Sequence, residues 1–87
     1  MAVLTLLSRA YCHLCDEMLA AAAPLAAAAG VTVQVIDVDA DPELERRYGD
    51  RVPVLIAGDA ATGSEICHFR LDPARLKAAL AVPAAAG

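Results

Sequence analysis

Four stretches of this 87-residue chain are rich in apolar and β-branched residues, and each is short enough to be a β-strand. The first is almost continuously apolar, which is typical of a strand that is covered on both faces. The second alternates in part between apolar and polar residues. The third follows a proline, which is acceptable at the first position of a strand. The predicted strands are residues 2–7, 31–36, 54–57 and 64–70.

The long alanine-rich stretch between the first two strands has the periodicity of an α-helix. Its larger apolar residues recur at spacings of four and seven, which places them on one helix face. We expect this helix to run from Cys12 to about Ala29. Pro24 conflicts with that pattern, because proline lacks an N–H and clashes with the preceding turn. We therefore expect a kink or a split near residues 20–23.

Two Asp-Pro pairs predict the starts of two shorter helices. An acidic N-cap followed by proline at the first helical position occurs at Asp41-Pro42 and again at Asp72-Pro73. The resulting order is β-α-β-α-β-β-α, in which the first βαβ unit should be parallel and the last two strands should form a hairpin. This order predicts an α/β fold with a four-stranded mixed sheet flanked by helices. We expect one domain over residues 1–82 and a frayed tail at residues 83–87.

Charge and composition argue against several classes of function. The net charge is −4, tryptophan is absent and aromatic residues make up 3% of the chain, which disfavours a nucleic-acid partner. No apolar run reaches the ~20 residues of a membrane span, and no signal peptide is evident, so we expect a cytoplasmic protein. Three cysteines without a secretory signal do not indicate a disulfide scaffold.

The most informative motif is Cys12-His13-Leu14-Cys15, at the predicted start of the first helix. Positions i and i+3 share a helix face, so the two sulfurs can meet and form a disulfide. A helix N-terminus carries partial positive charge and unpaired N–H groups, and both stabilise a thiolate, the reactive form of cysteine. The motif predicts a dithiol that cycles between reduced and oxidised states. The competing interpretation is an inert buried pair.

Two segments of the chain carry a family resemblance. Residues 8–15 (Ser-Arg-Ala-Tyr-Cys-His-Leu-Cys) look like the active-site loop of glutaredoxins, and residues 51–55 (Arg-Val-Pro-Val-Leu) look like the segment with their cis-proline. With the predicted order of elements, the chain resembles the glutaredoxin-like family of the thioredoxin-fold superfamily. The run over residues 36–55 is most similar to small bacterial members. The resemblance implies a thioredoxin/glutaredoxin-like fold over nearly the whole chain.

The resemblance also implies roles for individual residues. Cys12 would attack a substrate disulfide, and Cys15 would resolve the mixed disulfide. Tyr11 would border the substrate groove, although packing against the helix is a competing interpretation. A cis bond between Val52 and Pro53 would lie beside Cys12 and leave the Val52 backbone free to pair with an extended peptide or with glutathione.

Three charged or titratable residues near these motifs have two interpretations each. Arg9 and Arg51 either supply positive charge to the dithiol or to an anionic ligand, or they are ordinary surface arginines. His13, if protonated, would stabilise the Cys12 thiolate and make the protein a stronger oxidant. The alternative for His13 is a solvated side chain at the helix start.

The chain departs from the glutaredoxin pattern after the last strand. Glutaredoxins usually carry a Gly-Gly pair and an acidic residue there, which hold glutathione, whereas this chain has Phe69-Arg70-Leu71-Asp72. Asp72 is either the acidic contact or, more simply, a helix cap. Cys67 and His68 suggest zinc ligands, but adjacent residues of a strand point to opposite faces. We therefore expect Cys67 to be a core residue and expect no metal site.

Taken together, the sequence predicts a glutaredoxin-like thiol–disulfide oxidoreductase without a bound cofactor. It would act as a monomer on protein or small-molecule disulfides, with glutathione or a reductase as electron donor. The alternative is a non-catalytic thioredoxin-fold binding module that holds a protein partner or a metal at the groove of Cys12 and Cys15.

Overall fold

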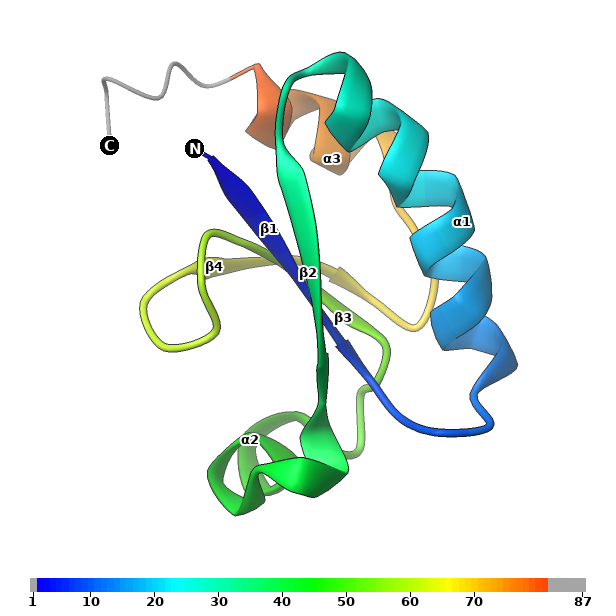
Figure 1. Cartoon of the computed structure of the whole chain (residues 1–87), viewed down its shortest axis with the longest axis vertical. Coiled ribbons are helices and arrows are strands. Elements are labelled where there is room, and N and C mark those ends of the chain that lie inside the picture. The colour runs from blue at the N-terminus through cyan, green and yellow to red at the C-terminus, as the bar shows by residue number, and fades with distance from the viewer. Residues whose placement is uncertain (1, 82–87) are drawn as a thin grey trace.

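A computed structural model describes residues 2–81, which form a four-stranded sheet with helices on both faces (Figure 1). The order β-α-β-α-β-β-α is confirmed, with one additional 3₁₀ turn, η1. The tail expected at residues 83–87 lies outside the described residues. The elements are β1 (Val3–Ser8), α1 (His13–Ala28), β2 (Thr32–Asp37), η1 (Val38–Ala40), α2 (Pro42–Tyr48), β3 (Val54–Ala57), β4 (Ser64–His68) and α3 (Pro73–Leu80).

The strand order is β2-β1-β3-β4, with β1 parallel to β2 and antiparallel to β3. The first βαβ unit is therefore parallel, and β3 and β4 pair antiparallel as a hairpin, both as predicted. Leu7, near the end of β1, lies opposite Val54, the first residue of β3. The loop that leaves β1 and the segment that enters β3 consequently meet at one edge of the sheet.

Alternating residues of the central strands build two apolar layers. Leu4 and Leu6 of β1 face α1 and α3, where Met18 and Leu76 are almost completely buried. Leu7 faces the opposite side and packs with residues of η1, α2 and β3. Burying a side chain of this size contributes about 1.5–3 kcal/mol, so the sheet is anchored from both faces.

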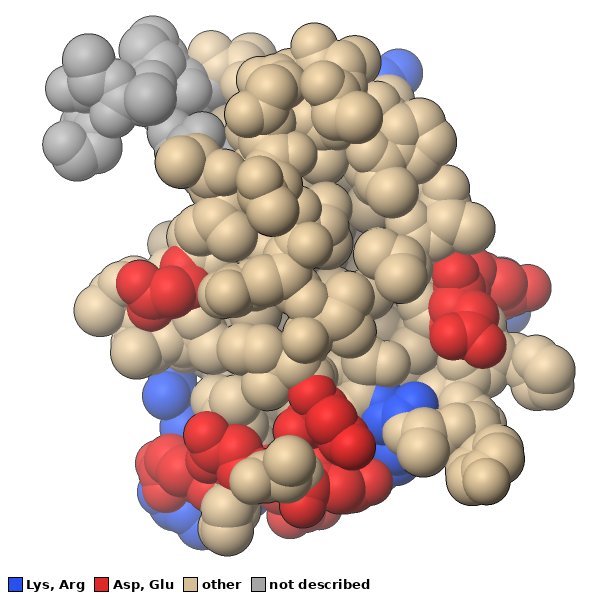
Figure 2. Space-filling view, in the orientation of Figure 1, with Lys and Arg blue, Asp and Glu red and all other residues tan. Residues whose placement is uncertain are grey.

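Charged side chains gather at the end of the molecule where α2 lies, whereas the C-terminal half of α1 and the neighbouring part of β2 show almost none (Figure 2). Both Asp-Pro signals start helices as predicted. The Asp41 carboxylate accepts hydrogen bonds from the N–H groups of Glu43 and Leu44, at 3.0 and 3.2 Å. The Asp72 carboxylate accepts one from the N–H of Arg75 at 3.1 Å, so Asp72 is a helix cap.

Of the two outcomes expected at Pro24, a kink or a split, the split is wrong. The helix is continuous from His13 to Ala28 with Pro24 inside it (Figure 1). Pro24 and Ala20, whose carbonyl lacks the usual i+4 N–H partner, are both exposed, so water can hydrate that carbonyl. The opposite face is buried against the sheet, and this packing outweighs the local cost of proline. No helix within residues 2–81 is long and apolar enough to cross a membrane.

We predict that Pro24→Ala raises the free energy of unfolding by about 1–3 kcal/mol, because alanine restores the hydrogen bond to the Ala20 carbonyl. Urea unfolding followed by circular dichroism measures this change. Ala20→Pro is the matched control at an exposed position one turn earlier, and it should be strongly destabilising. A less stable Pro24→Ala variant would show that the proline ring is needed for packing.

Candidate functional site at the Cys12–Cys15 disulfide

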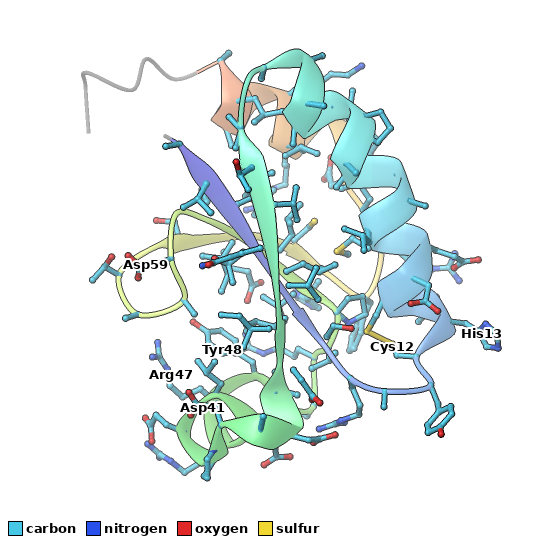
Figure 3. The ribbon with its side chains drawn as sticks, viewed as in Figure 1. Cys12, His13, Asp41, Arg47, Tyr48 and Asp59 are labelled. Atoms are coloured by element: carbon cyan, nitrogen blue, oxygen red, sulfur yellow. A yellow bond between two sulfur atoms is a disulfide. The ribbon has the colours of Figure 1, made fainter. Side chains whose placement is uncertain are left out.

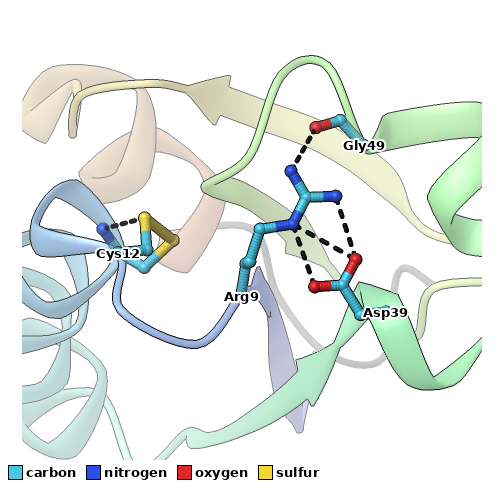
Figure 4. The surroundings of a disulfide bond; sticks show 5 residues. Arg9, Cys12, Asp39 and Gly49 are labelled. Carbon is cyan, nitrogen blue, oxygen red and sulfur yellow. Dashed lines mark hydrogen bonds and ion pairs between the residues drawn. A yellow bond between two sulfur atoms is a disulfide. The ribbon is translucent and has the colours of Figure 1, made fainter.

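Cys12 and Cys15 are joined by a disulfide at the start of α1, with their Cα atoms 5.2 Å apart. Cys12 is the N-cap residue of the helix, and its Sγ accepts a hydrogen bond from the Cys15 N–H at 3.1 Å (Figure 4). The residues preferred at this position are Ser, Thr, Asp and Asn, whose side-chain oxygen makes the same contact. The structure therefore places one sulfur of the pair where an N-terminal N–H can stabilise negative charge.

The two cysteines differ in accessibility. Cys12 is partly exposed, whereas Cys15 is only 1% exposed, because it lies on the buried face of α1. A sulfur from another molecule can approach Cys12 from solvent. Cys15 is shielded from such an approach and is placed to exchange with Cys12.

The Val52–Pro53 segment lies at the same edge of the sheet as the loop that carries Cys12. Its peptide bond is cis. Pro53 is buried, Val52 is half-buried, and the Pro53 carbonyl accepts a hydrogen bond from the Phe69 N–H at 2.9 Å. Within residues 2–81 the Val52 N–H and carbonyl have no backbone partner. These groups are available to a ligand with an extended backbone.

Two aromatic residues on neighbouring loops have left-handed backbone conformations. Tyr11 has φ 60° and Phe69 has φ 64°, and no other non-glycine residue of the described chain has a positive φ. This conformation costs roughly 1–2 kcal/mol for an L-residue. At Phe69 the left-handed conformation also ends β4, whose last residue is His68, two residues before the end predicted from the sequence. Tyr11 is fully exposed, so it does not pack against α1 and folding gains nothing from its ring.

A groove of about 280 Å³ opens between α1 and residues 69–71. Leu14, one of the two residues between the cysteines, forms part of its wall and is 36% exposed, and Phe69 is 46% exposed. The sequence analysis does not predict Phe69 as a site residue. Its position could have indicated a role, because Phe69 lies where glutaredoxins usually carry a Gly-Gly pair. The lining residues are Leu14, Glu17, Met18, Ala21, Phe69, Arg70 and Leu71.

The two arginines expected near the dithiol make contacts within the protein. Arg9 donates hydrogen bonds to Asp39 and to the Gly49 carbonyl, and Figure 4 shows its guanidinium turned away from the disulfide. The hydrogen bond to Asp39 raises the pKa of Arg9 above its already high value. Arg51 donates to the Arg47 carbonyl at 2.9 Å and pairs with Glu65 at 3.3 Å.

His13, Cys67 and His68 lie in three different environments. His13 is exposed and projects outward from the start of α1, away from Cys12 (Figure 3). Cys67 is buried in the core, as predicted, and burial raises the pKa of its thiol. His68 is on the exposed side of β4, where its Nδ1 lies 2.9 Å from Glu65. No cluster of three or more potential metal ligands occurs within residues 2–81.

A second hollow, of about 580 Å³, lies between β2, α2 and the β3–β4 turn. Its charged residues include Asp41, Arg47 and Asp59, which Figure 3 shows far from Cys12. Both carboxylates already accept hydrogen bonds from the protein. Asp41 caps α2, and hydrogen bonds from Thr62 and Ala61 lower the pKa of Asp59. These groups stabilise the local backbone, and nothing in this hollow contacts the Cys12–Cys15 pair.

Comparisons with known proteins agree with this geometry. The structure is similar to the solution structure of protein Ne2328 from Nitrosomonas europaea, with a TM-score of 0.73, 37% identity and 86% of each chain covered. It is also similar to the X-ray structure of protein XcR50 from X. campestris, with a TM-score of 0.60 and 42% identity. That match covers 92% of this chain and 99% of the other. The chain thus has a thioredoxin-like fold.

Sequence comparison gives relatives and a family. The uncharacterized proteins Rv0508 of Mycobacterium tuberculosis and Mb0520 of Mycobacterium bovis are each 33% identical over 81 residues, covering 87% of this chain and 79% of each relative. The model of the glutaredoxin-like domain (DUF836) matches residues 3–81. Because that match includes the Cys12–Cys15 pair and the Val52–Pro53 segment, the chain belongs to the glutaredoxin-like family.

Proposed function

We propose that this protein is a thiol–disulfide oxidoreductase in which Cys12 is the attacking thiol and Cys15 is the resolving thiol. The observation that carries the proposal is the disulfide between a partly exposed Cys12 at the helix N-cap and a Cys15 that is 1% exposed. Two equally exposed cysteines could both attack a substrate. The unequal exposure of Cys12 and Cys15 gives the role of attack to Cys12 and the role of resolution to Cys15.

The reaction proceeds in two exchange steps from the reduced dithiol. The Cys12 thiolate attacks one sulfur of a substrate disulfide, forms a mixed disulfide and releases the other substrate sulfur as a thiolate. The Cys15 thiolate then attacks the Cys12 sulfur, forms the intramolecular disulfide and releases the second substrate thiolate. Two electrons pass to the substrate, and two equivalents of glutathione or a dithiol reductase return them in the next cycle.

The start of α1 favours the first step. The Cys15 N–H that donates to the Cys12 sulfur at 3.1 Å would donate more strongly to a thiolate, because a charged acceptor makes a stronger hydrogen bond. The positive end of the 16-residue helix acts in the same direction. The His13 side chain is exposed, so water and salt screen any charge that it carries.

The surroundings of the dithiol suit a polypeptide disulfide. Tyr11, which directly precedes Cys12, is exposed, and Leu14 and Phe69 line one groove. The Val52 backbone can pair with an extended chain. Glutathione enters the proposal as a co-substrate that needs no permanent site. No bound cofactor is required, and the reducing cytoplasm is the compartment in which the dithiol would be regenerated. The monomer suffices for this chemistry, since both cysteines belong to one chain.

We predict that the parent reduces a disulfide-bridged reporter peptide with a glutathione-coupled or thioredoxin-coupled donor system, and that Cys12→Ser abolishes turnover. Cys15→Ser should stop at the mixed disulfide, because no second thiol resolves it, and mass spectrometry should detect that adduct. Turnover retained by Cys12→Ser would refute the mechanism. A parent that binds the peptide but reduces nothing with either donor would identify the binding-module alternative.

We predict that alkylation of Cys12 in the reduced protein reaches half its maximal rate at a pH clearly below ~8.5, which is the pKa of free cysteine. The shift is toward lower pH because the thiolate is the species that reacts, and a stabilised thiolate stays populated as the pH falls. Iodoacetamide labelling followed by peptide mass spectrometry separates Cys12 from buried Cys15. His13→Ala should show the same profile, because the N–H groups of α1 provide the stabilisation. A Cys12 profile like that of free cysteine would contradict the assignment.

We predict that Tyr11→Gly is at least as stable as the parent but less active on the reporter peptide. Glycine relieves the left-handed backbone, and no packing is lost because the ring is fully exposed. Loss of one apolar contact of about 1 kcal/mol would lower kcat/KM roughly fivefold. A small disulfide such as 2-hydroxyethyl disulfide is the matched control and should be reduced as fast as by the parent. Unchanged peptide reduction would remove Tyr11 from the substrate site.

A further inference from the structure

Arg9 connects the two parts of the candidate site, which are the loop that carries Cys12 and the segment that leads to Val52–Pro53. It follows β1 and lies three residues before Cys12. Its Nε lies 3.2 and 3.1 Å from the two Asp39 carboxylate oxygens, and its Nη2 lies 3.1 Å from one of them. Its Nη1 donates to the Gly49 carbonyl at 3.2 Å (Figure 4). Every nitrogen of the guanidinium is therefore engaged.

The partners of Arg9 belong to the segments that lead to the other half of the site. Asp39 is in η1, directly after β2, and Gly49 caps α2 three residues before Val52. Glu45 of α2 adds a longer ion pair at 3.5 Å. We call Arg9, Asp39 and Gly49 the Arg9 network. It connects the loop that carries Cys12 to the backbone that enters Val52–Pro53, although these segments are about forty residues apart in sequence.

The geometry of the network does not suit direct action on the sulfur. The guanidinium is turned away from the disulfide, and Asp39 and Glu45 compensate its charge. The ion pair is partly exposed, so its Coulomb energy is modest. A planar guanidinium adds orientation, because two of its nitrogens contact one carboxylate and the third contacts a carbonyl, which fixes the positions of three segments.

We propose that Arg9 is a positioning residue, which through Asp39 and Gly49 holds the Val52–Pro53 segment in register with Cys12. This inference rests on the oxidoreductase function proposed above. A disulfide exchange needs the attacking sulfur aligned with the substrate bond, and the Val52 backbone is the group that would align an extended substrate. Small displacements between a reacting group and its binding surface are costly, since about 1 Å of misplacement can lower a rate by ~100-fold.

Arg9→Lys is the most informative variant, because lysine keeps the charge but has a single donor nitrogen and cannot reproduce the contacts of three separate nitrogens. Arg9→Met removes the charge and keeps the apolar part of the side chain. Arg46→Met is the matched control, since it removes a bidentate arginine–carboxylate pair with Glu43 on α2 that has no contact with the Cys12 loop.

We expect Arg9→Lys and Arg9→Met to lower kcat/KM for the reporter peptide by a similar factor, at least ~10-fold. The alkylation profile of Cys12 against pH should stay unchanged in both, and Arg46→Met should behave like the parent. Full activity in Arg9→Lys would show that charge, not geometry, is what Arg9 supplies. A shifted alkylation profile would show that Arg9 acts on the sulfur directly. Either result would overturn the inference.

Hydrogen exchange tests the network independently of catalysis. The Arg51 N–H donates to the Tyr48 carbonyl at 2.8 Å, so its exchange reports on the segment between α2 and Val52. Arg9→Lys should accelerate exchange of the Gly49 and Arg51 N–H groups, which donate to the carbonyls of Glu45 and Tyr48, and Arg46→Met should not. An inactive parent with accelerated exchange in Arg9→Lys would remove the proposed function and leave the Arg9 network intact. Unchanged exchange of the Gly49 and Arg51 N–H groups would refute the positioning role even in an active protein.

Discussion

The candidate site depends on the central position of β1 between a parallel and an antiparallel neighbour. Because β3 runs opposite to β1, the exit from β1 and the entry to β3 lie at one edge, with Leu7 opposite Val54. Cys12 follows the exit, and Val52 and Pro53 precede the entry. No covalent link or metal is needed to bring these segments together, since the hydrogen-bonded register of two strands already does so.

The start of α1 at the same edge explains why Cys12 is partly exposed and Cys15 is buried. A cysteine at the N-cap keeps an extended backbone and points its sulfur back at the first helical N–H groups, whereas a residue three positions later lies fully within the helix. Cys15 then shares the buried face with Met18 and Ala22. The spacing of the motif thus determines both the contact between the sulfurs and their unequal exposure. Packing of α1 on the sheet maintains that difference.

Much of this arrangement follows from the sequence, because it depends on local signals. The Asp-Pro helix starts, the strand patterns and the Cys-x-x-Cys spacing each have a physical cause within a few residues. The unexpected features depend on tertiary structure. Pro24 is tolerated because its helix face is exposed, and Phe69 ends β4 by turning left-handed, which no periodicity indicates. The partners of Arg9 come from η1 and α2, so a reading of its neighbours in sequence could not identify them.

These tertiary contacts also bear on what the site can recognise. An anionic ligand such as glutathione would compete with Asp39 for Arg9 and with Glu65 for Arg51, since both guanidinium groups are already paired. Asp72 lies at the position where glutaredoxins carry an acidic residue that holds glutathione, but here it caps α3. Under the proposed function, an apolar side chain of a polypeptide would meet no such competition at Leu14 and Phe69. The left-handed Tyr11 and Phe69 cost the fold stability, and contact with an extended substrate is the benefit that would offset that cost.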